Sequence, residues 1–393
     1  MIQPGYCFLY HRHKHREESR STDSSPTEND SGSEHDDREK TNDAYSYWQT
    51  FEWTSQELKN TQEVLESHLS TSDLILNNPQ GRGKYIKDNL EHNAHQHWDK
   101  FYTQHKTKFF KDRHYLQKAF PHEFGILYQN HDTRKSKQVD INENTHHDRL
   151  TVIEIGCGVG NTVLPLLELH PWITIDSQSS KTQKKLLQVW GLDFSSIAID
   201  LLKQDERFLQ ANQQYHHPRA HAAVWDITQH YPQEIDSRLH QAADISMLLF
   251  CFSAIAPSKM VQAAKHVADT LKPGGVLIFR DYGRYDEAQM KLGTSRRKRL
   301  GDNYYVKHDL TRVYYFDLDD LRRLFGSNDC GDSDTTTTST SIDNCITHKE
   351  RECIGAGLEI LELKYIQRLY TNRSNGDIRR RVWVQGRFRK PML

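Results

Sequence analysis

The sequence has few features that would mark a disulfide-bonded, metal-binding or membrane-spanning protein. Its six cysteines are scattered without a C-x-x-C pair, so their spacing indicates neither a disulfide framework nor a zinc site. The longest apolar stretch, SMLLFCFSAIA at 246–256, is shorter than the ~20 residues of a membrane helix and is interpreted as a buried strand. No signal or transit peptide is indicated. We therefore expect a cytoplasmic protein, with the nucleus as the alternative, and no metal site.

The chain also has almost no net charge, because its 52 Lys and Arg residues are balanced by 53 Asp and Glu residues. The charges are segregated, however. Residues 17–43 are rich in Asp and Glu, whereas residues 291–299 and 368–390 are rich in Lys and Arg, so the balance says little about partners. Residues 11–43 have almost no apolar content, and residues 1–44 are expected to be a disordered tail. A disordered Ser/Thr/Asp insertion is expected at about 326–353, and a shorter insertion at 176–185.

What the sequence does contain is an alternation of strand-like and helix-like segments. Nearly continuous apolar runs, typical of buried strands, occupy 150–155, 186–194, 220–227, 243–252 and 275–282. Amphipathic segments, typical of helices, occupy 161–170, 195–209, 257–272 and 317–325. Such alternation predicts a parallel sheet covered by helices on both faces. The fold class is therefore α/β and Rossmann-like.

The end of the chain departs from this alternation. Two strand-like segments at 358–370 and 380–388 flank Asn375-Gly376, a dipeptide typical of hairpin turns. An antiparallel hairpin at the edge of a seven-stranded sheet is the arrangement of class I methyltransferases. Residues 45–149 lack the alternation, and the helical spacing at 55–69 predicts a mostly helical N-terminal extension. We therefore divide the folded chain into this extension and a sheet domain at 150–393.

A glycine-rich loop follows the first expected strand. It places Gly156, Gly158 and Gly160 at a strand-to-helix turn, where the backbone can approach a ligand. Dinucleotide-binding loops usually read G-x-G-x-x-G and hold a pyrophosphate, whereas here Glu154 precedes glycines at every second position. A carboxylate there would attract an ammonium group and repel a pyrophosphate. The loop favours S-adenosylmethionine, the alternatives being NAD or a plain tight turn.

Two aspartates lie at the ends of the next two expected strands. Asp193 ends the second, where a carboxylate can accept both ribose hydroxyls of a nucleoside. Asp226 ends the third and resembles the acid that contacts the adenine edge in methyltransferases. Ligands of parallel sheets bind at this carboxyl edge. Together with the glycine loop, the two aspartates predict a site for S-adenosylmethionine.

Several blocks of the sequence resemble one family, the tRNA N3-methylcytidine methyltransferases that modify cytidine 32 of the anticodon loop. The matching blocks are HWDKFY, KFFKDRHYL, IEIGCGVGNTVLPLLE, DFSSIAIDLL, FSAIAPSKM, LKPGGVLIFRDYGRYD, NYYVKHDLTRVYYF and RRVWVQGRFRKP. The resemblance implies an enzyme with a class I fold that uses S-adenosylmethionine. The sequence of these blocks is most similar to that of family members acting on threonine tRNA, with serine and arginine tRNAs as alternatives. One departure is His308-Asp309-Leu310, where the family usually shows Gly-Asp-Gly.

The resemblance also implies which residues bind the cofactor. These are Trp98, Tyr102, Gly156, Gly158, Asp193, Asp226, Ile227 and Leu249. Trp98 and Tyr102 are spaced to share one face of a helix, and we expect that face to close over the methyl donor as a lid.

The chemistry of the target suggests the catalytic residues. Cytosine N3 carries a lone pair at neutral pH, so its methylation needs positioning rather than a general base. The product is cationic, and a nearby carboxylate would favour the transition state. We expect Asp281 to supply it, with Arg280 and Tyr282 orienting the base or backbone. The alternative is a structural ion pair between Arg280 and Asp281.

Basic residues are expected to contact the phosphates of a tRNA anticodon stem-loop. The candidates are Lys111, Arg113, Arg296, Arg297, Arg380, Arg381 and Arg389. Arg113→Ala is predicted to weaken tRNA methylation more than S-adenosylmethionine binding. A solvated charged face is the alternative. We further expect a monomer without a membrane partner, assisted by an aminoacyl-tRNA synthetase or another accessory protein. Two other functions stay open, namely a non-catalytic tRNA-binding partner and a methyltransferase for proteins or small molecules.

Overall fold

The computed structural model describes residues 49–71, 88–132, 148–176, 182–213, 218–231, 233–295, 298–327, 355–371 and 378–392. The expected tail at 1–44, nearly all of the insertion at 326–353, the turn at Asn375-Gly376, and Arg296 and Arg297 lie outside these residues. Among the described helices, none has the length and apolar character that a membrane span requires.

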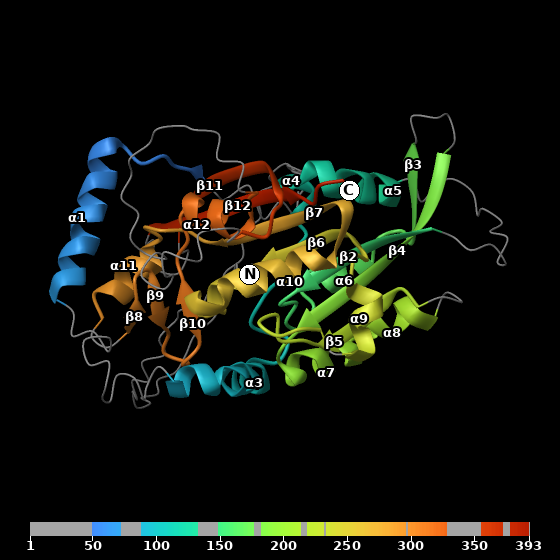
Figure 1. Cartoon of the computed structure of the whole chain (residues 1–393), viewed down its shortest axis with the longest axis horizontal. Coiled ribbons are helices and arrows are strands. Elements are labelled where there is room, and N and C mark those ends of the chain that lie inside the picture. The colour runs from blue at the N-terminus through green and yellow to red at the C-terminus, as the bar shows by residue number, and fades with distance from the viewer. Residues whose placement is uncertain are drawn as a thin grey trace, which may run out of the picture.

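The predicted seven-stranded sheet lies at the centre of the molecule (Figure 1). Its parallel strands are β2 (Arg149–Ile155), β4 (Thr182–Asp193), β5 (Ala220–Val224), β6 (Ala243–Leu249) and β7 (Leu271–Tyr282). The hairpin β11 (Glu359–Thr371) and β12 (Ile378–Arg389) supplies the other two predicted strands, with β12 antiparallel to β7. Two further strands, β1 (Gln49–Thr50) and β3 (Trp172–Asp176), bring this sheet to nine strands in the described part of the chain. The spatial order is β11-β12-β7-β6-β2-β4-β5. The class I arrangement expected from the sequence is confirmed.

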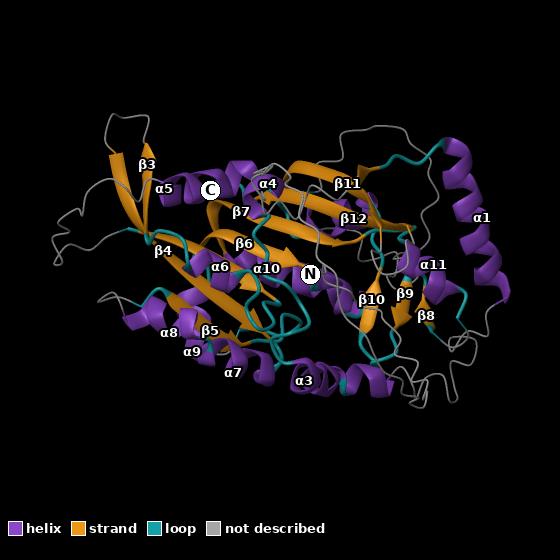
Figure 2. Ribbon diagram, turned by 180° about the vertical axis from the view of Figure 1, so that it is seen from behind, coloured by secondary structure: helices purple, strands orange, loops and turns teal. Residues whose placement is uncertain are grey.

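Helices cover both faces of the sheet (Figure 2). Successive residues of a strand point to opposite faces, so continuously apolar strands give the sheet two apolar faces that helices must bury. One apolar cluster joins Ile153 and Phe279 to helices α9 (Gln233–Leu239), α10 (Pro257–Thr270) and α12 (Leu318–Phe325). The other joins Val152 and Ile278 to α4 (Leu116–Ala119), α5 (Pro121–Asp132), α6 (Val163–Leu167), α7 (Ser196–Gln204) and α8 (Glu206–Gln213).

Two helix boundaries differ from expectation. The segment 195–209 forms two helices rather than one, because Asp205 breaks it and its carboxylate accepts the Arg207 backbone N–H at 3.0 Å, starting α8. The helix expected at 161–170 is the shorter α6, since the glycine loop occupies the residues before it and a strand follows at Trp172.

The segment 176–185 was expected to be an insertion, but its described residues, Asp176 and 182–185, belong to strands of the sheet, and 177–181 lie outside the described residues. Strand β3 (Trp172–Asp176) pairs antiparallel with the first half of β4, joining Trp172 to Leu186 and Asp176 to Thr182. The second half of β4 pairs with β5. The long β4 thus has β2 on one side and both β3 and β5 on the other.

The N-terminal extension contains the helices α1 (Ser55–Thr71) and α3 (Ala94–His105), besides α4 and α5. Its short strand β1 (Gln49–Thr50) adds to the sheet beside β11. The sequence did not indicate the separate small sheet of β8 (Arg299–Gly301), β9 (Tyr304–Val306) and β10 (Arg312–Tyr314). Figure 1 shows this sheet, α11 (Glu287–Gly293) and α1 at one end of the molecule and β3 at the other.

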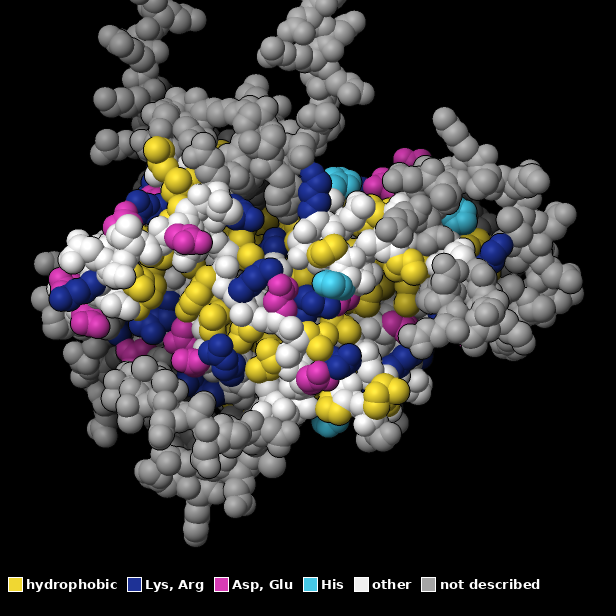
Figure 3. Space-filling model, turned by 90° about the horizontal axis from the view of Figure 1, so that it is seen from above, with side chains coloured by type: hydrophobic (Ala, Val, Ile, Leu, Met, Phe, Trp, Pro, Cys, Tyr) yellow, Lys and Arg dark blue, Asp and Glu magenta, His cyan; other side chains and the backbone are white. Residues whose placement is uncertain are grey.

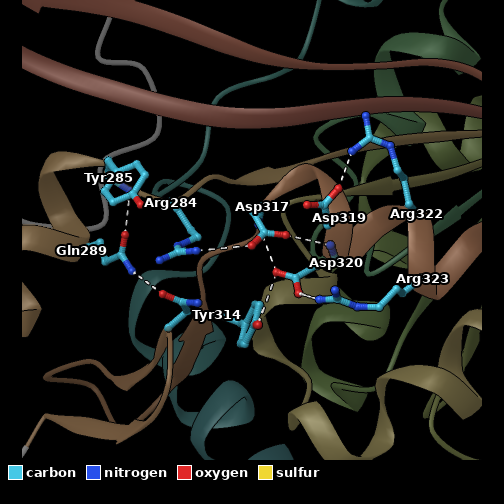
Figure 4. A network of polar contacts seen from close by, with 10 residues as sticks. Arg284, Tyr285, Gln289, Tyr314, Asp317, Asp319, Asp320, Arg322 and Arg323 are labelled. Carbon is cyan, nitrogen blue, oxygen red and sulfur yellow. Dashed lines mark hydrogen bonds and ion pairs between the residues drawn. The ribbon is translucent and has the colours of Figure 1, made fainter. Parts of the chain in front are cut away.

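A polar network fixes the small sheet against α12 (Figure 4). Asp317 and Asp320 form a capping box at the start of α12, in which each carboxylate accepts a backbone N–H of the other residue. Asp317 also pairs with Arg284 after β7 at 3.4 Å, and Asp320 pairs with Arg323 at 2.8 Å. Burial and the neighbouring Asp317 raise the pKa of Asp320 to about 7.

Candidate functional site

A cavity of about 690 Å³ lies at the carboxyl ends of β2, β4 and β5, the edge at which parallel sheets bind ligands. Six of the eight predicted cofactor residues line it: Trp98, Tyr102, Gly156, Asp193, Asp226 and Ile227. Gly158 and Leu249 line a smaller cavity of about 50 Å³ that shares Trp98, Tyr102 and Gly156 with the first. The structure therefore brings all eight positions together, and their individual roles stay predictions.

The glycine loop has the geometry that its sequence predicts. Gly156, Gly158 and Gly160 have φ values of 73°, 55° and 89°, in the left-handed region that favours glycine. A Cβ at Gly156 would also collide with the thiol of Cys251, and one at Gly158 with the hydroxyl of Tyr102. Both conformation and space thus require glycine where the backbone borders the cavities.

Asp193 joins the glycine loop to the end of β4. Its two carboxylate oxygens accept the backbone N–H groups of Gly158 at 2.8 Å and Ser195 at 2.9 Å. Burial raises the pKa of Asp193 to about 6, and these hydrogen bonds only partly offset the increase. Each oxygen has a second lone pair, so the carboxylate can still accept a ribose hydroxyl from the cavity.

The wall after β5 carries the second predicted aspartate. Asp226 accepts the backbone N–H of Thr228 at 2.9 Å and its hydroxyl at 2.8 Å, which closes a tight turn. Trp225, Asp226, Ile227 and Thr228 all line the large cavity. This turn presents a carboxylate and an apolar side chain together, the combination that a purine nucleoside needs.

Helix α3 covers the site from the opposite side. The rings of Trp98 and Tyr102 stack with their centroids 6.0 Å apart, as the spacing in the sequence predicted. Phe101 lies in the same apolar cluster, with Phe109 and Phe110 packed against it. Ser195 donates its hydroxyl hydrogen to Asp99 at 2.5 Å, which ties α3 to the start of α7. The aromatic face of α3 is therefore part of the cavity wall as well as a packed core.

A second set of contacts holds the segment before α3 in place, and the sequence did not indicate it. Glu91 lines the large cavity and forms ion pairs with Arg312 of β10 and with Lys259 of α10, the latter at 2.5 Å. These partners are far from Glu91 in the sequence, and no motif connects them. Glu91 thus links three separate segments at the cavity.

Glu154 and Arg113 pair with each other behind the glycine loop. Arg113 donates to Glu154 at 2.9 Å and to the Thr162 hydroxyl at 2.9 Å. Glu154 is fully buried and lines neither cavity, so it does not face a ligand as the sequence suggested. Burial raises the pKa of Glu154 to about 7, and the Arg113 charge lowers it only in part. Arg113 itself borders the small cavity.

The three predicted catalytic residues lie in different surroundings. Asp281 is fully buried and accepts the backbone N–H groups of Ser253 and Tyr282, both at 2.8 Å. Burial raises the pKa of Asp281 to about 6. Tyr282 lines the small cavity. Arg280 does not pair with Asp281, because neighbouring strand residues face opposite sides of the sheet; it donates to Gln385 at 3.0 Å and lies over the Tyr115 ring.

The basic hairpin is neutralised within the chain. Arg380 pairs with Glu57, Arg381 with Asp286 and Arg389 with Glu359, at 3.0, 2.8 and 2.7 Å. Figure 3 shows one face of the molecule, on which basic and acidic side chains are interspersed rather than gathered into one basic patch. By contrast, Lys111 is exposed, as are Lys100, Lys106 and Lys108 in and after α3. No carboxylate in the described part of the chain forms an ion pair with these four lysines.

The residues present fit S-adenosylmethionine. The large cavity has a volume within the usual range for small-molecule sites. Its glycine loop excludes a Cβ, its two carboxylates suit a nucleoside, and Trp98 and Ile227 supply apolar surface. Phe250, between the two cavities, has a φ of 58°, an uncommon value for a bulky residue and typical of functional sites.

Comparisons with known proteins agree with this site. A family model described as a methyltransferase domain matches residues 89–330. The chain is 32% identical over 367 residues to tRNA N(3)-cytidine methyltransferase METTL2 of Danio rerio, covering 88% of this chain and 85% of that protein. It is 32% identical over 281 residues to tRNA(Thr) (cytosine(32)-N(3))-methyltransferase of Saccharomyces cerevisiae, covering 72% and 37%. It is 29% identical over 405 residues to O-methyltransferase 3 of Dictyostelium discoideum, covering 88% and 79%.

The fold and these relatives establish the chain as an enzyme that uses S-adenosylmethionine as its methyl donor. Because the similarity to the Danio rerio protein extends over most of both chains, this protein belongs to the family of tRNA N(3)-cytidine methyltransferases.

Proposed function

We propose that this enzyme methylates N3 of cytidine 32 in the anticodon loop of a tRNA. The observation that carries the proposal is the aromatic wall of the small cavity beside the glycine loop. Phe250 and Tyr282 form this wall, with their ring centroids 5.3 Å apart, and Lys307 and Arg113 border it. Flipped bases stack on such rings, and cationic side chains hydrogen-bond their carbonyl oxygens.

The wall must move to admit a base. A cavity of about 50 Å³ is smaller than a pyrimidine ring, so the lining side chains have to separate when the RNA binds. Phe250 is the natural point of movement, because its backbone already has the strained left-handed conformation.

The reaction requires that the base be positioned against the methyl group and that the charge developing on the base be stabilised. The bound cofactor supplies an electrophilic methyl group, and N3 of cytosine supplies the lone pair. Asp281 is fully buried and lines neither cavity, but it accepts hydrogen bonds from Ser253 and Tyr282, which both line the small cavity. Its carboxylate would stabilise the positive charge that develops on the base.

Threonine tRNA is the proposed substrate, and serine and arginine tRNAs are the alternatives. The name of the Saccharomyces cerevisiae relative specifies tRNA(Thr) and position 32. The lysines in and after α3 suit the phosphates of the anticodon stem, because they are exposed and adjoin the helix that covers the cofactor cavity.

Nucleoside mass spectrometry tests the proposal directly. The purified chain is incubated with S-adenosylmethionine and total tRNA, with and without aminoacyl-tRNA synthetases. We expect 3-methylcytidine to accumulate, and sequencing of the product to place it at position 32 of threonine tRNA. Bound S-adenosylhomocysteine without 3-methylcytidine in any fraction would contradict the proposal while leaving the methyltransferase fold intact.

A second candidate is methylation of a hydroxyl group, favoured only by the name of the Dictyostelium discoideum relative. The same incubation distinguishes the two. An O-methylated small molecule formed from a cell extract without RNA would support this candidate, and dependence on tRNA would exclude it.

A further inference from the structure

The segment at residues 225–231, called the cavity wall because 225–228 line the large cavity, is fastened to α10 through one residue, His266. The ring atom Nδ1 of His266 lies 2.8 Å from the carbonyl oxygen of Ile227. Tyr231, at the far end of the wall, donates its hydroxyl hydrogen to the backbone carbonyl of His266 at 2.9 Å. His266 is 2% exposed and lines neither cavity. One buried residue thus holds the wall at two points without facing the cavity.

The contacts of the ring specify its tautomer. A carbonyl oxygen can only accept, so Nδ1 must carry the hydrogen and donate it to Ile227. The other ring nitrogen, Nε2, then accepts, and it lies 2.7 Å from the amide nitrogen of Gln262, which donates. Gln262 and His266 are one turn apart on α10, so the helix itself orients the ring.

The packing around the ring leaves the wall little freedom. Trp225, Ile227 and Tyr231 belong to the same apolar cluster as Met260, Ala263 and Val267 of α10. The Trp225 indole also donates to the carbonyl of Gln229 at 3.1 Å, which closes the wall on itself. The bond from His266 to Ile227 therefore sets where the turn at Asp226 lies relative to the cavity.

We propose that His266 is a positioning residue for the cofactor, which holds Asp226 and Ile227 in place for the adenosine end of S-adenosylmethionine through its Nδ1 hydrogen. The inference rests on S-adenosylmethionine binding in the large cavity, which the proposed function also requires. It does not depend on which molecule accepts the methyl group. It is tested without RNA, and its failure is distinguishable from a failure of tRNA methylation.

Two substitutions separate the hydrogen bond from general packing. In His266→Asn the amide nitrogen can occupy the place of Nδ1, whereas in His266→Gln it reaches only toward the place of Nε2. Calorimetric titration of the full chain with S-adenosylhomocysteine measures the Kd. We expect His266→Asn to bind within about twofold of the original protein, and His266→Gln to bind about tenfold more weakly, the effect of one lost buried hydrogen bond.

Hydrogen exchange of the chain without cofactor provides a second measurement. Amides at 225–231 should exchange faster in His266→Gln than in His266→Asn, while those of β2 stay unchanged. With saturating cofactor, kcat for methylation should be the same in both variants. His240→Gln, at an exposed histidine after α9, serves as the matched control.

Equal affinity of the Asn and Gln variants, whether strong or weak, would overturn the proposal, because the position of the N–H would then not matter. If neither variant folds, Tyr231→Phe tests the other fastening point. That change removes one buried hydrogen bond to the backbone of His266 and should raise the Kd about threefold. An unchanged Kd would show that the fastening of the wall does not govern cofactor affinity, and would reject the inference.

Discussion

At the scale of single residues, Asp193 carries the clearest prediction. Asp193→Ala removes the carboxylate that accepts from Gly158 and Ser195 and borders the cavity, so cofactor binding should be abolished. The original protein should bind more weakly as the pH falls below about 6, because protonation of a group with that pKa removes the acceptor for a hydroxyl. Calorimetry between pH 5 and 8 checks both. A Kd independent of pH would show that the carboxylate does not contact the ligand.

Asp281 carries a prediction about turnover. Asp281→Asn keeps the shape of the side chain and removes its charge, so kcat should fall about tenfold to a hundredfold while S-adenosylhomocysteine binding is unchanged. Asp320→Asn is the matched control, because Asp320 is also fully buried with a raised pKa but lies in the network of α12. Single-turnover methylation of tRNA measures the rates. Equal rates for the original protein and Asp281→Asn would make Asp281 structural.

The sequence predicted the position of some residues better than that of others. Gly156, Asp193 and Asp226 follow strands, and parallel strands bring their carboxyl ends to one edge, so their proximity was predictable. The ion pair between Arg113 and Glu154 was not predictable, because Arg113 lies 41 positions before Glu154 and meets it only through the packing of its own segment. With that ion pair in place, Arg113→Ala should weaken cofactor binding as well as tRNA methylation.

At the scale of elements, Glu91 links the segment before α3 to β10 and α10. Glu91→Gln removes both ion pairs, so this segment should open more often and release S-adenosylhomocysteine several-fold faster, as expected for partly buried pairs. Stopped-flow fluorescence of Trp98, which lines the cavity, can follow the release. Glu63→Gln, in an exposed pair with Lys59 on α1, should leave the rate unchanged. A release rate equal in both variants would contradict the prediction.

Elements were predictable where local pattern and tertiary structure agree. The five parallel strands are nearly continuous apolar runs, the strands of the final hairpin mix apolar with charged residues, and all seven formed close to the expected positions. Strand β3 and the small sheet of β8 to β10 were missed. Their strands have only three to five residues, too few to show a pattern of their own, and the pairing of β8 with β9 is irregular.

At the scale of the whole molecule, buried carboxyl groups determine the response to pH. Burial raises the pKa of Glu154 and Asp320 to about 7 and that of Asp193 and Asp281 to about 6. The folded chain thus binds these protons more tightly than the unfolded chain. Without cofactor, the free energy of unfolding should rise by about 1–2 kcal/mol as the pH falls from 8 to 6.5.

His221 opposes the increase from about pH 7 downward, because burial lowers its pKa to about 4 in the folded chain while the unfolded chain takes up the proton near pH 6.5. Urea unfolding at several pH values measures the curve. Asp320→Asn should flatten it, and a free energy that falls between pH 8 and 6.5 would be inconsistent with these pKa values.

The arginines of β12 give this side of the sheet a formal positive charge that carboxylates of the same chain balance. All five, at positions 379, 380, 381, 387 and 389, are paired with carboxylates. An RNA phosphate that replaced one of these partners would release few counterions, because the arginine has few to lose. The slope of log affinity against log salt should therefore count the exposed lysines near α3 and not the arginines of the hairpin. A run of arginines that the sequence suggests as a phosphate-binding surface is thus, in the folded chain, a set of intramolecular ion pairs.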